Sequence, residues 1–465
     1  MQQEFRDHPC YTGRNLFDFH DQKKNFQEIR DRLVVGNKIT QGRHSSVYRC
    51  NYEAIPGERN GYTVKIPKTL LEKQQIVITR LGKLQIAVNS QGTIQHNGIW
   101  KKEFDRFNKE FIMGEYVMDP PTLRRLESYR QRKHAGAQII DNLDDETMQQ
   151  IDYERKLMEN HPGFHHLLHL VHFIPEVPCI IAESCDGNSF RLFMDGTLSS
   201  NKELTSTYIS HVAMAMLFLY DICGLAHVDL KFSNVLYRLN TPRNYQFILS
   251  DYGSCYYAED PWEHNPVGTE GYTPTTQKYL PSNSHYYPWS IETSLIINVS
   301  IYELLSIILH LCLKSFFDKE GMQYNEVLKL TSARVLQLAS KIASDGLQYY
   351  PAECNQINHL VQIMHKEPSF FTYAGLPKII SSFPKDIKEK IQQVGADINH
   401  YEEHEDDLIR LDYHKKFEPS FLSHQDNMQA QNGQANTKNT QNAQANKQAQ
   451  NGSVGLRQNA VCVCS

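Results

Sequence analysis

The chain has 465 residues, of which 40% are hydrophobic and 11% aromatic, enough for one large domain or two ordinary ones plus a tail. Its formal net charge of -5 argues against a general binder of nucleic acid or of anionic membranes, because both require a basic face. The ten cysteines include no CxxC pair and no disulfide-like spacing, which is typical of free thiols in a reducing compartment.

The first strand patterns follow a polar lead-in, residues 1–30. Apolar residues from 34 to 39, a Gly/Ser turn, and then Val47 and Tyr48 predict two strands joined by a tight turn. Residues 61–66 (GYTVKI) predict a third strand, which Pro67 ends because proline donates no hydrogen bond to a sheet.

Residues 68–150 show no single pattern and are interpreted as a long insert. Within it, residues 83–94 alternate apolar and polar around Ser90-Gln91-Gly92, which predicts a hairpin. Residues 123–133 predict an exposed basic helix, and residues 141–146 form an acidic run typical of a solvated surface.

Helical patterns dominate the remainder of the chain. Residues 151–159 predict a helix that His161-Pro162-Gly163 stops, and residues 174–182 predict a buried strand. Helical spacing returns over residues 204–220 and again, after residue 316, up to about residue 411.

The segment Leu295–Leu313 is rich in Ile and Leu and has the length of a membrane span. It contains Asn298, Glu303 and His310, and an ionised glutamate is costly at the centre of a bilayer. The segment is therefore expected to be a helix buried on all sides within a large domain.

Residues 424–465 are expected to be disordered, because the Gln/Asn/Ala-rich stretch from His424 to Ala460 has no Phe, Trp or Tyr. Such a segment cannot bury enough apolar area to offset the entropy of ordering. The last four residues, CVCS, loosely match a C-terminal prenylation signal on Cys462, with a frayed tail as the alternative. A lipid there would add membrane association to a cytoplasmic protein.

The strongest chemical signal lies in residues 227–234 (HVDLKFSN) and 251–253 (DYG). The first segment places Asp229, Lys231 and Asn234 on one loop, and the second places Asp251 at the end of an apolar strand. Two carboxylates, a cation and a carboxamide suit phosphoryl transfer, which depends on positioning and on neutralising charge. Magnesium needs few protein oxygen ligands when it also binds phosphate.

These two segments resemble the catalytic loop (H-R-D-x-K-x-x-N) and the D-F-G turn of protein kinases. The resemblance implies an α+β, two-lobed kinase-like fold that uses ATP and Mg2+. A small β-rich lobe with one main helix would span residues 31–185, including the insert, and a large, mostly helical lobe residues 186–420. It also implies Asp229 and Lys231 as catalytic residues, with Asn234 and Asp251 as metal ligands.

The same resemblance extends to the expected nucleotide site. Residues 39–47 align with the glycine-rich loop G-x-G-x-x-G-x-V, although Gly42 is the only one of its glycines present. Lys65, in the sequence YTVK, resembles the lysine that holds the α- and β-phosphates. Glu154 is the expected carboxylate partner of that lysine, with Asp152 as a rival.

Residues 178–187 resemble the strand and hinge that seat adenine, with Ala182 unusually small at the back of the pocket. The resemblance adds further residues around the nucleotide: Glu183, Cys185, Val47, Thr63 and Leu236. Residues 268–272 (GTEGY) resemble the substrate-facing loop, where Thr269 would contact Asp229 and Lys231. Thr269 and Lys231 both imply a Ser or Thr hydroxyl of a protein as the acceptor.

Four positions depart from the family pattern. Val228 replaces the arginine that reads an activation-loop phosphate, and Tyr252 replaces phenylalanine, adding a hydroxyl that needs a partner if buried. The expected glutamate after Pro274-Thr275 is absent, and Tyr287 stands where an aspartate would anchor the catalytic loop. Two alternatives therefore remain: a catalytically weak, nucleotide-binding scaffold on the same fold, or a small-molecule kinase of the aminoglycoside-phosphotransferase type.

Overall fold

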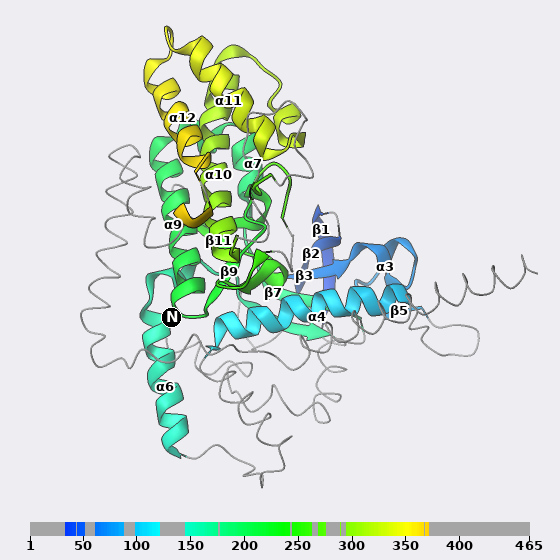
Figure 1. Ribbon diagram of the computed structural model, residues 1–465. Helices are drawn as coiled ribbons and strands as arrows, with labels where there is room; N and C mark the ends of the chain where they lie inside the picture. Colours follow the sequence, from blue (N-terminus) through cyan, green and yellow to red (C-terminus); the bar gives the residue numbers. More distant parts are fainter. Residues whose placement is uncertain are drawn as a thin grey trace, which may run out of the picture. The chain divides into compact units, whose positions relative to one another are not determined.

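The computed structural model describes residues 33–42, 44–51, 61–87, 98–120, 145–174, 177–241, 244–262, 268–275, 289, 294–366 and 368–371. All of them belong to one of the two compact units into which the chain divides. This unit is a mixed α+β structure in which strands dominate the N-terminal region and helices follow (Figure 1).

The main sheet has five antiparallel strands in the order β1-β2-β3-β7-β6. The three expected N-terminal strands are confirmed, but the single strand expected over residues 174–182 is two strands. Pro178 falls in the turn before the second of them, where no ladder hydrogen bond is required of it. The strands are β1 (Val34–Gln41), β2 (Ser45–Asn51), β3 (Tyr62–Pro67), β6 (Leu170–Ile174) and β7 (Cys179–Glu183).

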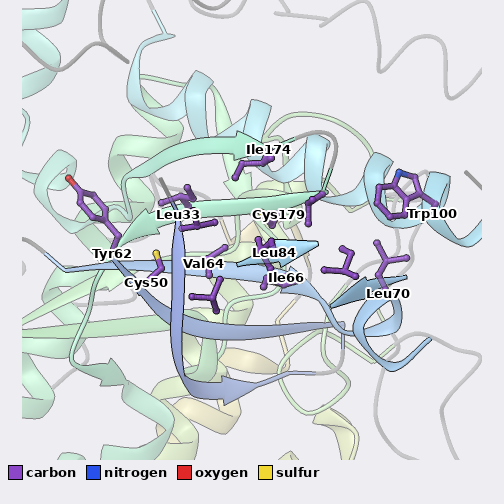
Figure 2. Packing of buried hydrophobic residues seen from close by; sticks show 14 residues of the cluster. Leu33, Cys50, Tyr62, Val64, Ile66, Leu70, Leu84, Trp100, Ile174 and Cys179 are labelled. Carbon is purple, nitrogen blue, oxygen red and sulfur yellow. The ribbon is translucent and has the colours of Figure 1, made fainter. Parts of the chain in front are cut away.

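The segment expected to be an insert contributes to the core of this region. It contains α3 (Lys68–Glu72), the hairpin of β4 (Ile76–Ile78) and β5 (Leu84–Ile86), and the long helix α4 (Gly98–Met118). Val64 and Ile66 of β3 form one apolar cluster with Leu84 of β5 and Trp100 of α4 (Figure 2). Part of the segment therefore packs on the sheet instead of looping out.

The hairpin of β4 and β5 turns at Gly82, whereas the turn expected at Ser90-Gln91-Gly92 lies outside the described residues. Gly82 has a φ of +74°, and a Cβ there would lie 2.4 Å from the carbonyl oxygen of Val35. The Gly82 carbonyl accepts a 2.8 Å hydrogen bond from the Val35 amide. This close approach to β1, which only glycine permits, fixes the turn.

The expected helices over residues 151–159 and 204–220 are confirmed as α6 (Asp145–Asn160) and α9 (Lys202–Asp221). Asn201 caps α9 by accepting the Leu204 amide at 3.1 Å. Later helices complete the C-terminal part: α10 (Ile296–Glu320), α11 (Ser332–Gly346) and α12 (Pro351–Met364), with the short α7 (Ser189–Met194) and α8 (Thr197–Ser200) earlier in the chain.

Helix α10 is the apolar segment that could be mistaken for a membrane span. Among the described residues it is the one helix that is long and apolar enough to cross a bilayer, yet 94% of its apolar window is buried inside the protein. Asn298, Glu303 and His310 are buried with it. The expected core helix is confirmed.

Two small sheets position the remaining segments. One pairs β9 (Leu225–His227) with β12 (Cys255–Tyr257), and the other has the order β11-β10-β8. The HVDLKFSN loop thus connects β9 to β10, and the DYG turn connects β11 to β12. The second sheet consists of β8 (Gly187–Asn188), β10 (Val235–Thr241) and β11 (Asn244–Leu249).

Candidate functional site

Asp229 is the centre of a dense set of hydrogen bonds. Its Oδ1 accepts the Thr269 hydroxyl at 2.6 Å, and its Oδ2 lies 2.5 Å from the Lys231 ammonium. The Asn234 side-chain amide donates to the Asp229 carbonyl at 2.9 Å and to Oδ2 at 3.2 Å. The carboxylate is thereby fixed in one orientation, with 15% of its side chain exposed.

Thr269 reaches this carboxylate from the separate segment 268–275. The Lys231 ammonium also contacts the Thr269 hydroxyl, at 3.0 Å, so the three side chains form a closed triangle. Gly268 has a φ of +137°, and a Cβ there would lie 2.0 Å from the Thr273 hydroxyl. Glycine is required at this close approach, which turns the segment toward Asp229.

A second ionic group surrounds Lys65 on β3. Its ammonium lies 2.6 Å and 2.7 Å from the two carboxylate oxygens of Glu110 on α4, and 3.1 Å from Oδ1 of Asp251. Lys65 is 23% exposed and Glu110 only 7%. The charges are therefore only partly screened by water.

The expected pairing of Lys65 with Glu154 is wrong. Glu154 is on α6, where its carboxylate accepts a 3.0 Å hydrogen bond from the Gln150 side chain. The rival Asp152 lies on the same helix, 3.5 Å from Arg155. Helix α4 packs on the sheet beside Lys65, and α6 follows it in the chain. Because residues 68–150 were interpreted as an insert, α4 was not expected to supply the partner of Lys65.

Burial and charge act in opposite directions on this ionic group. Burial alone would lower the pKa of Lys65, but the carboxylates of Asp251 and Glu110 raise it above its usual value. Burial would raise the pKa of Asp251, but the charge and hydrogen bond of Lys65 hold it below its usual value. Burial raises the pKa of Glu110 to about 7, against the lowering effect of Lys65.

The DYG turn is strained and tightly packed. Asp251 has a φ of +70°, a conformation costly for a residue other than glycine and one that clusters at functional sites. The hydroxyl of Tyr252 is buried and donates to the Leu168 carbonyl at 2.8 Å, the partner that its position demands. A Cβ on Gly114 of α4 would lie 3.0 Å from the Tyr252 ring, so helix and turn are in direct contact.

Helix α4 makes one more contact beyond this turn. The Lys109 ammonium lies 4.0 Å from the centre of the Tyr256 ring on β12, within the range of a cation–π interaction.

The residues expected around a nucleotide lie on neighbouring strands. Val47 of β2 is paired with Lys65 of β3, and Thr63 of β3 with Ala182 of β7. Gly42 closes the β1–β2 turn by donating its amide to the Ser45 carbonyl at 2.8 Å.

The end of β7 is tied to β10. The carboxylate of Glu183 lies 2.9 Å from the guanidinium of Arg238. Cys185 is half-buried, and burial raises the pKa of its thiol to about 12, which disfavours the thiolate form. Leu236 is on β10, opposite Asn188.

Asn234 and Asp251 are the residues that could hold a divalent cation. The amide nitrogen of Asn234 is committed to Asp229, which leaves its oxygen, a hard ligand, for a cation. About a third of the Asp251 side chain is exposed, at 35%. Two such oxygen ligands fit a cation that is also bound by phosphate.

Sequence reasoning missed two residues, Glu110 and Glu303. A signal for Glu110 exists in the helical spacing of Phe104, Phe107 and Phe111, which mark a buried face across residues 98–118. Glu303 was identified only as a charge within an apolar segment, although both of its carboxylate oxygens make hydrogen bonds.

No protein-family model matches this chain, and neither does any curated protein. Several expectations lie outside the described residues: the lead-in 1–30, the basic helix 123–133, Tyr287, the tail 424–465 and Cys462.

Proposed function

We propose that this protein is a divergent Ser/Thr protein kinase, which transfers the γ-phosphate of Mg-ATP to a protein hydroxyl. The observation that carries the proposal is the triangle of Asp229, Lys231 and Thr269, with contacts of 2.5 to 3.0 Å. A base, a cation and a hydroxyl in mutual contact match what transfer to an alcohol requires.

In this proposal Asp229 accepts the proton of the incoming hydroxyl. The Thr269 hydroxyl, 2.6 Å from Oδ1, marks the direction from which a hydroxyl reaches that carboxylate. Lys231 offsets the negative charge that develops on the transferred group. Lys65 holds the α- and β-phosphates, and Glu110 fixes its ammonium in place. Asn234 and Asp251 would hold a magnesium ion, which would further neutralise the phosphate charge.

The arrangement of the strands and α4 also supports a kinase-like, two-lobed fold. A five-stranded antiparallel sheet with one long helix against it would be the small lobe, and the helices from α7 onward the large lobe. In this reading α4 supplies the main helix and Glu110 its carboxylate. The alternative, a nucleotide-binding scaffold, draws on the loop near Gly42, which has one glycine of the usual three.

The test is transfer of labelled γ-phosphate by the purified full chain, with Mg2+, to itself and to a generic protein substrate. We expect Asp229→Asn, which keeps the size of the side chain, to lower the rate about 100- to 10,000-fold, as loss of a general base does. Asp152→Asn on α6 is the matched control and should leave the rate unchanged. Stabilisation by Mg-ATP without any transfer by the wild type would select the scaffold instead.

A further inference from the structure

Glu303 is a buried acid in the middle of α10, with no exposed surface. Its Oε2 accepts the backbone amide of Leu230 at 2.7 Å, and its Oε1 lies 2.9 Å from the Thr273 hydroxyl. Leu230 immediately follows Asp229, and Thr273 belongs to the segment that carries Thr269. One side chain therefore connects the backbone of the HVDLKFSN loop to segment 268–275.

The Thr273 hydroxyl has two possible acceptors, Glu303 and the Thr269 carbonyl. The Thr273 hydroxyl also lies 3.2 Å from the Thr269 carbonyl, and it has a single hydrogen to donate. The Thr269 carbonyl already accepts the backbone amide of Thr273 at 3.0 Å, so the hydroxyl is free to donate to Oε1 of Glu303 at 2.9 Å. Both carboxyl oxygens of Glu303 therefore accept a hydrogen bond, one from each segment. Burial, and next the nearby Asp229 charge, raise the pKa of Glu303 well above its usual value.

We infer that Glu303 is a positioning residue, which locks the Asp229 loop and the Thr269 segment into one unit through its two carboxyl oxygens. The inference rests on the proposed phosphoryl transfer and extends it. The two segments are also joined directly, because the Thr269 hydroxyl donates to Asp229 at 2.6 Å. A fixed relation between base and acceptor loop matters, since a misplacement of about 1 Å can cost roughly 100-fold in rate.

Other buried hydroxyls hold the same segment. Ser306, one turn along α10 from Glu303, donates to the Tyr272 carbonyl at 2.8 Å. Thr275 shares a 2.8 Å hydrogen bond with Ser332 and accepts the Ala333 amide at 2.9 Å. Segment 268–275 is thus fastened to α10 and α11 by contacts that need no phosphate. These contacts agree with the presence of Val228, which replaces the arginine expected to bind an activation-loop phosphate.

The experiment compares Glu303→Gln, Glu303→Ala and Thr273→Val in the full chain. Glutamine can accept from Leu230 and donate to Thr273, so Glu303→Gln should keep kcat within about threefold of wild type. Glu303→Ala should lower kcat about 100-fold, with the KM for ATP unchanged, because Lys65 lies elsewhere. Thr273→Val keeps the shape of threonine but removes the hydroxyl that bonds Glu303. It should therefore also lower kcat.

Hydrogen exchange supplies a readout that does not depend on catalysis. Glu303→Ala and Thr273→Val should speed exchange in peptides 225–235 and 268–275, while Glu303→Gln should not. Lys314→Met is the matched control, since Lys314 is a buried charge on the same helix that pairs with Asp318. It should leave both peptides unchanged.

Two results would overturn the inference: unchanged exchange in both peptides of Glu303→Ala, or a loss in Glu303→Gln as large as in Glu303→Ala. If the wild type showed no transfer activity, only the proposed kinase function would be refuted. The hydrogen-exchange result would still decide whether Glu303 positions the two segments.

Discussion

Replacing Glu110 by glutamine tests the ionic group around Lys65 most directly. Glutamine keeps the shape of the side chain but removes the charge that lies 2.6 Å from the ammonium. Breaking a buried ion pair costs about 3–5 kcal/mol. Because Lys65 is 23% exposed and keeps Asp251 at 3.1 Å, the cost here should be smaller, about 2–3 kcal/mol. If transition-state binding carries this loss, kcat/KM for ATP falls about 30- to 150-fold.

The assay measures phosphoryl transfer at several ATP concentrations for wild type, Glu110→Gln and Glu154→Gln. Glu154 is 4% exposed and bonded to Gln150, so its variant is matched in chemistry and burial. Its kcat/KM should stay within about threefold of wild type. Full activity in Glu110→Gln together with a large loss in Glu154→Gln would refute the assignment of the lysine partner.

Two further predictions concern stability. Tyr252→Phe leaves the buried Leu168 carbonyl without the hydroxyl now 2.8 Å away, so the free energy of unfolding should fall by about 1–2 kcal/mol in a denaturant titration. The exposed Tyr349→Phe should change nothing, and equal effects of the two would contradict this reasoning. Burial lowers the pKa of His161, His166 and His310 to about 4 each, so these side chains are neutral in the native state. In the unfolded chain the pKa of a histidine is about 6.5. The free energy of unfolding is therefore highest above that pH and falls as the pH drops toward 4. Each of the three histidines should lower it by roughly 2 kcal/mol at pH 5. Stability that stays flat from pH 7 to pH 5, or an equal fall in His310→Phe, would contradict the prediction.

The sequence predicted elements where a single periodic pattern dominates. Strands β1 to β3 alternate beside turn residues, and α9 and α10 repeat apolar positions at helical spacing, so local pattern and tertiary burial agree there. The triangle of Asp229, Lys231 and Thr269 could be anticipated because two short motifs carry all three residues.

The sequence could not reveal the partner of Lys65, because pairing across space depends on which helix packs against the sheet. Charged residues break up the apolar pattern of α4, so its aromatic face was overlooked. Glu303 was missed for another reason. A glutamate in an apolar helix signals burial, but only the fold shows that its partners are the Leu230 amide and Thr273.

The contacts of α4 have a mechanical consequence. Lys109 on the Tyr256 ring, Glu110 on Lys65 and Gly114 against Tyr252 all fall within six consecutive residues of this helix. Sliding the helix by one residue, about 1.5 Å, would break all three contacts together. The positions of Lys65 and of the DYG turn are therefore both set by the register of this one helix.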